Sequence, residues 1–234
     1  MPCILSSTDI QRLLKEGNVS VAPEMINAVA NANSTRTRQL AFHAIMNTFG
    51  SGEGNSGESI IESIGYLTVA SVYRPKVICE IGVNLGHSTA TWLTGSNLCE
   101  VEVYAFDIGI HPYVDKVVKF YSALLPNRFH YFKGDSTVTL PKFLESVGAS
   151  WAKCDLFHVD GGHFGNVPEL DIKNAYSMIK PGGLMAIDDC PCPSAWCTAP
   201  TKAFQDAVAS GLLAEHMTVP LDVNHGFSVA YVQK

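Results

Sequence analysis

Three aspartates and one histidine are the side chains in this sequence most suited to chemistry. Asp160 directly follows one short apolar run, Asp188 and Asp189 follow another, and His163 comes three residues after Asp160. Such runs are typical of buried parallel strands, whose carboxyl ends form the ligand-binding edge of open α/β sheets. We therefore expect the three carboxylates to converge. An oxygen-only ligand set favours a hard cation such as Mg²⁺, and a neighbouring imidazole suits proton transfer near neutral pH.

The alternative interpretation of these four residues is purely structural. Asp188 and Asp189 would then cap a loop, Asp160 would accept backbone hydrogen bonds, and His163 would be a loop histidine bonded to backbone. A single aspartate favours that alternative. Three at neighbouring strand ends favour the cation, because the carboxylates would repel one another strongly if none were neutralised.

A second group of candidates lies in a glycine-containing turn, residues 80–88, between a predicted strand and a predicted helix. Its G-x-x-x-G spacing differs from the G-x-G-x-x-G of dinucleotide binding, which argues against a nicotinamide dehydrogenase. The helix N-terminus could hold a carboxylate, and Asp107, at the end of the next strand, could accept both hydroxyls of a ribose. A ligand with both groups and no pyrophosphate suggests S-adenosylmethionine; the alternative is a structural turn. The candidates in the turn are Glu80, Gly82, Asn84, Gly86 and Ser88.

The elements that must position these residues alternate between strands and helices from residue 58 onward. This alternation predicts an α/β fold with a doubly wound, seven-stranded, mostly parallel sheet of the Rossmann-like kind. The predicted strands are 76–81, 100–106, 129–132, 155–159, 184–187, 216–219 and 227–232; the predicted helices between them are 58–72, 89–93, 114–125, 140–147, 167–179 and 201–210, with a turn at 180–183.

Residues 1–57 are predicted to be a separate N-terminal helical extension, and residues 58–234 the ligand-binding domain. Short helices are expected within 4–16, 23–32 and 37–47. The glycine-rich segment 50–57 is either a linker between the two parts or the edge of a lid.

Composition narrows the class of protein. The chain has 234 residues, 47% of them hydrophobic, and a net charge of -6 with no Lys/Arg run, which argues against nucleic acid and anionic membranes as partners. No apolar stretch approaches the roughly 20 residues that span a bilayer, and the N-terminus does not resemble a signal peptide.

Seven cysteines, an odd number, suggest a reducing, cytoplasmic setting. Cys79 and Cys154 are expected to be buried thiols; free thiols are favoured over a zinc site for Cys190, Cys192 and Cys197.

At this point the chain resembles the class I, metal-dependent O-methyltransferases, methyltransferase family 24. The resemblance covers residues 58–190 and includes the catechol O-methyltransferase-like enzymes and, more closely, the macrolide-sugar O-methyltransferase branch. Five motifs carry it in the expected order: E-x-G-x-x-x-G-x-S at 80–88, the acid at 107, GDS at 134–136, VDGGH at 159–163 and PGGLMAIDD at 181–189.

The resemblance implies roles for individual residues. In the expected S-adenosylmethionine site, Gly82 and Ser88 lie at the methionine part and Asp107 lies at the ribose. Asp135 and Ser136 lie at the adenine, and Glu80 lies at the turn or the amino group. The remaining residues of the expected cofactor site are Asn84, Gly86 and Asp160. The resemblance also implies Mg²⁺ or another divalent cation at Asp160, Asp188 and Asp189, and His163 as the base that deprotonates the acceptor. The catechol branch has Asp-Asn where this chain has Asp188-Asp189, and the second charge suits the sugar branch better.

The expected function is Mg²⁺-dependent methyl transfer from S-adenosylmethionine to a hydroxyl of a small molecule: a sugar, a natural product or a catechol-like diol. Trp196 is the best candidate for a pocket wall, whereas Trp92 and Trp151 are expected in the core. Two alternatives remain: a metal-dependent hydroxylase-type relative on the same scaffold, and a non-catalytic protein that binds the cofactor. N-terminal helices in such folds often pair subunits, so a homodimer is one expected arrangement.

Overall fold

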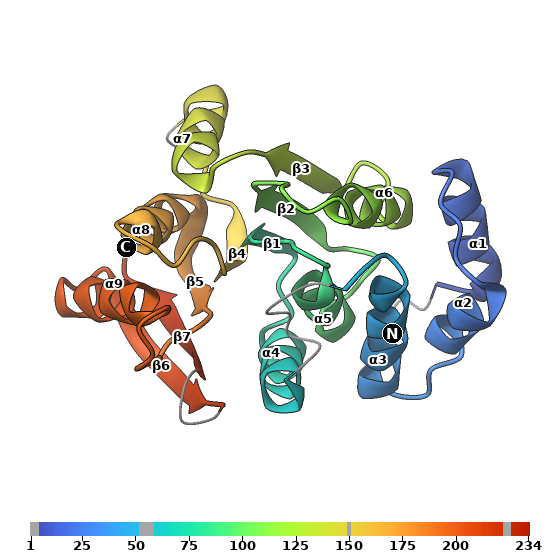
Figure 1. Ribbon diagram of the computed structural model, residues 1–234, viewed down its shortest axis with the longest axis horizontal. Helices are drawn as coiled ribbons and strands as arrows, with labels where there is room; N and C mark the ends of the chain where they lie inside the picture. The colour runs from blue at the N-terminus through green and yellow to red at the C-terminus, as the bar shows by residue number, and fades with distance from the viewer. Residues whose placement is uncertain (1–4, 52–58, 149–150, 222–225) are drawn as a thin grey trace. The chain divides into compact units, whose positions relative to one another are not determined.

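The computed structural model describes residues 5–51, 59–148, 151–221 and 226–234. Its strands form one seven-stranded sheet in the order β3-β2-β1-β4-β5-β7-β6 (Figure 1). The apolar runs that predicted the strands are buried in it, as expected for a sheet covered by helices. The strands are β1 (Val77–Ile81), β2 (Glu102–Asp107), β3 (Phe129–Lys133), β4 (Cys154–Val159), β5 (Ile179–Ile187), β6 (Leu213–Pro220) and β7 (Gly226–Val232).

The pairing of β4 with its neighbours positions the predicted site. β1, β4 and β5 pair in parallel, and Val159 lies opposite both Ile81 and Ile187. Asp160 and Asp188 therefore leave the sheet at the same edge, one residue beyond a matched pair. β7 pairs antiparallel with both β5 and β6. The predicted α/β fold with a seven-stranded, mostly parallel sheet is confirmed.

The described residues group into two compact units whose segments interleave along the chain. One unit comprises Met1–Lys76, Val83–Val103 and Gly109–Tyr131, here called unit 1; the other, unit 2, comprises Val77–Gly82, Tyr104–Ile108 and Phe132–Lys234. The predicted division at residue 57 falls among residues 52–58, outside the described residues, and stays a prediction; so does the lid assigned to 50–57.

Unit 1 contains the N-terminal helices and the helix that follows the glycine turn. Within it α1 packs against α2 and α6, α3 against α2 and α5, and α4 against α5. Ser6, Ser34 and Ser59 cap the first, third and fourth of these helices by accepting a backbone hydrogen bond. The helices are α1 (Ser7–Glu16), α2 (Pro23–Ala30), α3 (Thr35–Asn47), α4 (Ile60–Tyr73), α5 (His87–Gly95) and α6 (Val114–Leu124).

Unit 2 contains the strands that carry the acidic residues and three helices: α7 (Ser136–Val147), α8 (Val167–Met178) and α9 (Thr198–Ala209). α8 packs against β4 and β5 and lies between α7 and α9 (Figure 1). The described helices include none with the length and apolarity that a membrane crossing requires.

Several sequence-based boundaries were wrong, and the two largest differences concern α7 and β5. α7 begins at Ser136, four residues before the predicted start at Leu140, because Asp135 caps it by accepting the backbone N–H of Thr137 at 2.9 Å. Residues 180–183 belong to β5 and do not form a separate turn, because β5 begins at Ile179, which pairs with Cys154 of β4 across an irregularity in the register.

The prediction of free thiols was correct for Cys190 alone among the five cysteines considered. Cys79 on β1 and Cys154 on β4 are joined by a disulfide, as are Cys192 and Cys197, with Cα atoms 5.9 and 5.6 Å apart. Both pairs lie within the Cα separation that a disulfide requires. Cys190 is free and buried, and burial raises the pKa of its thiol to about 11, which keeps it protonated.

Two buried histidines link α3 to α5 within unit 1. His43 Nε2 lies 3.1 Å from the carbonyl oxygen of His87 and 3.0 Å from Thr91 Oγ1, and His87 Nε2 lies 2.9 Å from Asn47 Oδ1. Burial lowers the pKa of each histidine to about 4, and for His43 the neighbouring His87 adds to the shift. Both rings are therefore neutral at pH 7.

This pair predicts a loss of stability in mild acid. Between pH 6.5 and 4 the unfolded chain protonates both rings and the folded chain does not, so the free energy of unfolding falls as the pH falls, by up to about 3 kcal/mol for each ring. Urea unfolding at pH 7 and pH 4.5 should show a smaller difference for His43→Gln than for wild type. The exposed control His216→Gln should behave as wild type does; an unchanged difference in His43→Gln would contradict the prediction.

Candidate active site

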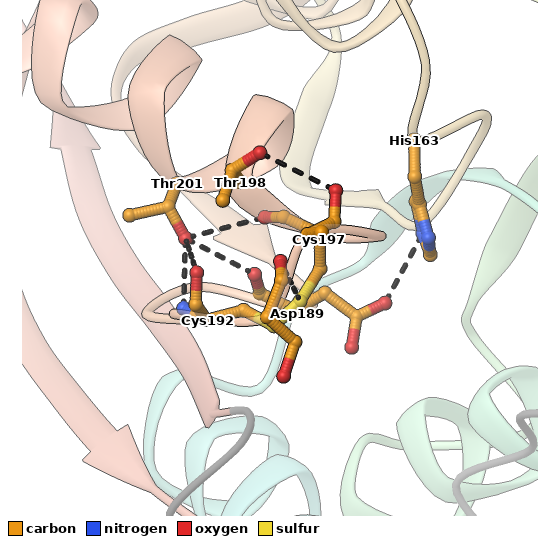
Figure 2. The surroundings of a disulfide bond; sticks show 8 residues. His163, Asp189, Cys192, Cys197, Thr198 and Thr201 are labelled. Atoms are coloured by element: carbon orange, nitrogen blue, oxygen red, sulfur yellow. Dashed lines mark hydrogen bonds and ion pairs between the residues drawn. A yellow bond between two sulfur atoms is a disulfide. The ribbon is translucent and has the colours of Figure 1, made fainter.

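Asp160, His163 and Asp189 meet where β4 and β5 end in unit 2. One ligand atom from each lies within 4.8 Å of the others, and His163 Nε2 lies 3.1 Å from Asp189 Oδ2. Figure 2 shows the Asp189 carboxylate turned toward the His163 ring. Asp188, the third predicted metal ligand, is not part of this group of three. The parallel pairing thus brings together residues that are 29 positions apart in the sequence.

Backbone contacts hold these residues at the sheet edge. The Asp160 N–H donates to the carbonyl oxygen of Ile81 at 3.2 Å, and the Asp188 N–H to that of Val159 at 3.0 Å. Gly82 makes the close approach possible, since a Cβ there would overlap the carbonyl oxygen of Asp160, and its φ of 86° favours glycine. Asp189 has a positive φ of 53°, which redirects the chain immediately after Asp188.

The electrostatics of the cluster suit a cation. Burial raises the pKa of Asp189 to about 8, and the negative charge of Asp188 adds to the shift. Without a counter-charge, Asp189 would therefore be largely protonated at pH 7. Two further carboxylates, those of Asp160 and Asp188, lie at the same edge of the sheet. A divalent cation would offset both causes of the shift, so the donor set fits a hard metal ion.

The segment after Asp189 is held by hydrogen bonds to Thr201 and is closed into a short loop by the Cys192–Cys197 disulfide. The Thr201 hydroxyl accepts the backbone N–H of Cys192 at 2.8 Å and lies 3.4 Å from the carbonyl oxygen of Asp189 (Figure 2). Within this segment the ring of Trp196 is centred 5.5 Å from that of His163, and 45% of the residue is exposed. An exposed indole beside the imidazole can contact a ligand.

The predicted cofactor residues in unit 2 end β1 and β2 or begin α7. Asp107, which is buried, ends β2, and its carbonyl oxygen accepts the N–H of Gly134 at 2.9 Å. Glu80 is fully buried, and its Oε1 lies 3.1 Å from His158 Nδ1, a contact that joins β1 to β4; its predicted role at the turn stays a prediction. Asp135 caps α7 and leads directly into Ser136.

The other predicted cofactor residues lie in unit 1, at the start of α5. Asn84 and Gly86 have positive φ values of 46° and 82°. Asn84 Oδ1 accepts a hydrogen bond from the Tyr113 hydroxyl at 2.7 Å, and the Gly86 carbonyl accepts one from Tyr121 at 2.6 Å. Ser88 is buried in the first turn of α5. No structural result assigns a ligand to these residues, so their roles stay predictions.

Comparison with known proteins identifies the domain. Residues 79–190 match the family model of a methyltransferase domain, and they include both the glycine turn and the acidic cluster. Residues 79–190 form a methyltransferase domain. This match confirms the predicted methyltransferase within residues 79–190, and the fold is the one expected of the class I enzymes. No curated protein shows significant similarity to the chain.

Solved structures share the fold of this methyltransferase at low sequence identity. The cofactor-bound Rv0187 from MTB is 17% identical, with a TM-score of 0.64 over 100% of this chain and 99% of that one. The O-methyltransferase from Bacillus cereus, in complex with SAH, is 14% identical, with a TM-score of 0.63 over 96% and 100%. The MycE methyltransferase of the mycinamycin pathway, in complex with Mg and SAH, is 16% identical, with a TM-score of 0.51 over 73% and 49%.

One buried residue beside the candidate site is not predicted from the sequence. Asp171 of α8 is fully buried and lines a small cavity together with Asp160, His163 and Asp188. The signal for it was helical spacing: Asp171 lies four residues before Ala175, on the buried side of α8. A carboxylate on the buried side of a helix is costly to remove from water, so its burial requires an explanation.

Proposed function

We propose that this enzyme transfers the methyl group of S-adenosylmethionine to a hydroxyl oxygen of a small molecule, with Mg²⁺ or another divalent cation held by Asp160, Asp188 and Asp189. The observation that carries the proposal is the cluster at the ends of β4 and β5. Carboxylates and an imidazole lie within reach of one another there, in a chain with a methyltransferase domain. The Bacillus cereus and MycE structures, described with SAH and with Mg and SAH, support the same assignment.

The metal assignment is supported by the chemistry of the donors. The carboxylates offer oxygen atoms, which hard divalent cations prefer, and the raised pKa of Asp189 reflects negative charge and burial that a cation would offset. A cation bound there would supply the positive charge that lowers the pKa of an acceptor hydroxyl.

His163 is proposed as the general base. Burial lowers the pKa of its ring, with Asp188 opposing the shift, so the imidazole is neutral at pH 7 and can take up a proton. Asp189 holds Nε2 through its 3.1 Å contact and would stabilise the protonated ring. When bound, S-adenosylmethionine would supply the methyl group and be released as S-adenosylhomocysteine, and His163 would take up the proton of the hydroxyl that is methylated.

The acceptor is proposed to lie against exposed aromatic side chains. Phe164 adjoins His163 in the sequence and is 76% exposed, and the Trp196 ring lies beside His163. Such surfaces favour a molecule that presents a flat apolar face next to its hydroxyl. A catechol-like diol, a natural product with a ring, or the less polar face of a sugar fits this description.

The test combines binding with turnover. Calorimetry should detect S-adenosylmethionine binding to the purified protein. A panel of catechols, glycosides and hydroxylated natural products should yield S-adenosylhomocysteine in Mg²⁺, lose turnover in EDTA and regain it when Mg²⁺ is added back. Absence of cofactor binding would overturn the methyl donor, and equal turnover in EDTA would overturn the metal. A screen in which no hydroxyl compound is methylated would count against an oxygen acceptor.

A further inference from the structure

Asp171 is buried without the pairing that a buried carboxyl group normally requires. The residue is fully buried, and within the described part of the chain neither carboxylate oxygen has a hydrogen-bond partner of ordinary geometry. Burial raises the pKa of Asp171 to about 6, opposed by the nearby Ser136 hydroxyl and reinforced by the charge of Asp135. An unpaired polar group of this kind is costly, and in native proteins it usually marks bound water, an ion or a functional role.

The carboxyl group of Asp171 lies against the loop 160–163, which follows β4. A Cβ built on Gly161 would lie only 2.6 Å from Asp171 Oδ2, so the absence of a side chain at residue 161 allows the carboxyl group to approach the loop backbone. The loop carries the predicted metal ligand at one end and the predicted base at the other. Asp171 itself is on α8 (Val167–Met178), which is a different element from the loop.

A small cavity connects Asp171 with the site. It measures about 10 Å³ and is lined by Asp171, Asp160, Gly161, His163 and Asp188, among others. That is close to the least space that accommodates one water molecule, and the polar groups around it supply the partners that an ordered water needs. A water there could bond to Asp171 and to the loop at the same time.

We propose that Asp171 is a positioning residue, which holds the loop 160–163 in place through one water molecule bound between its carboxyl group and that loop. This inference rests on the proposed function, because the loop matters through the cation and the base that it carries. Removal of a residue that orients a metal ligand typically lowers metal affinity by about 10- to 100-fold.

The test compares three substitutions in the full-length protein. Asp171→Leu replaces the carboxyl group with an apolar side chain of similar size, Asp171→Asn keeps a polar group, and Glu169→Leu removes an exposed carboxylate from the same helix as a control. Mn²⁺ affinity, kcat, KM for S-adenosylmethionine and Tm are measured for each. The long-range ¹H–¹⁵N NMR signals of the His163 ring are recorded without metal, assigned by their loss in His163→Gln.

Asp171→Leu is expected to keep a Tm within a few degrees of wild type, since an apolar side chain replaces an unpaired carboxyl group. Its Mn²⁺ affinity and kcat should fall about 10- to 100-fold with little change in the cofactor KM, and its His163 signals should shift or broaden. Asp171→Asn should restore most of the affinity and the wild-type signals, and Glu169→Leu should match wild type. If the leucine variant does not fold, Asp171→Ala takes its place.

A folded Asp171→Leu with wild-type Mn²⁺ affinity and unchanged His163 signals would overturn the proposal and leave Asp171 a structural residue. If the wild-type protein bound no divalent cation, the proposed function would fail. The His163 signals of the metal-free variants would still decide whether Asp171 positions the loop.

Discussion

Replacing Asp160 with asparagine is expected to weaken divalent-cation binding by at least about 100-fold and to reduce methyl transfer to the level measured in EDTA. Asp160 belongs to the group whose ligand atoms lie within 4.8 Å of one another, and its backbone is held by the hydrogen bond to Ile81. Asparagine has nearly the same shape, so it removes the charge and leaves the backbone hydrogen bond in place. Cation binding is measured by calorimetry with Mn²⁺ and Mg²⁺, and turnover as S-adenosylhomocysteine formed.

The matched control for Asp160→Asn is Asp206→Asn, which removes an exposed carboxylate of α9 that is paired with Lys202. The control should retain wild-type cation affinity and turnover, because exposed ion pairs contribute little. Cation-dependent turnover that persists in Asp160→Asn at saturating cofactor would show that Asp160 is not a metal ligand. Activity of Asp160→Asn that returns only at high Mg²⁺ would instead show a cation site with weakened affinity.

His163→Gln is expected to lower kcat by about 10²- to 10⁴-fold, the usual contribution of a general base, while S-adenosylmethionine affinity stays within a few-fold of wild type. The reason is that glutamine keeps a polar side chain beside Asp189 and cannot take up a proton. Steady-state kinetics across pH 6 to 9 and calorimetry with the cofactor provide the measurement. The control His216→Gln, an exposed histidine of β6, should leave kcat unchanged.

The same variant separates the two roles that the geometry allows for His163. Its ring nitrogen lies within the group of three possible ligand atoms, so it could bind the cation directly. A base predicts that Mn²⁺ affinity is retained in His163→Gln, whereas a ligand predicts that the affinity falls together with kcat. Loss of cation binding would therefore reassign His163 from base to ligand, and wild-type kcat would exclude both roles.

Much of the fold could be predicted because local patterns agree with the tertiary structure. The apolar run before Asp160 and the run before Asp188 are strands, since buried parallel strands are apolar on both faces. The start of α7 was misplaced because Asp135 and Ser136 were interpreted as ligand residues, although an aspartate followed two residues later by a threonine N–H is also a helix cap. The antiparallel pairing of β7 depends on long-range contacts that no local pattern contains.

The cysteines illustrate what sequence cannot resolve. An odd count in a chain of this size favoured thiols, yet Cys79 of β1 and Cys154 of β4 form a disulfide, although they are 75 residues apart in the sequence. The number and spacing of cysteines do not show that long-range contacts bring Cys79 and Cys154 within bonding distance. Trp92 and Trp151, in contrast, were expected in the core and are buried, and Trp196 was expected at a pocket and is exposed.

The sequence by itself determined the order of strands and helices, the family, and the edge of the sheet at which Asp160, His163 and Asp189 lie, because apolar periodicity and short motifs are local properties. Only the tertiary structure decided that Asp189, and not Asp188, joins Asp160 and His163 in one group, and that Asp171 lies behind them. The physical reason is that side-chain direction at a strand end depends on backbone angles and on packing across β4, β5 and α8, which neither residue type nor spacing specifies.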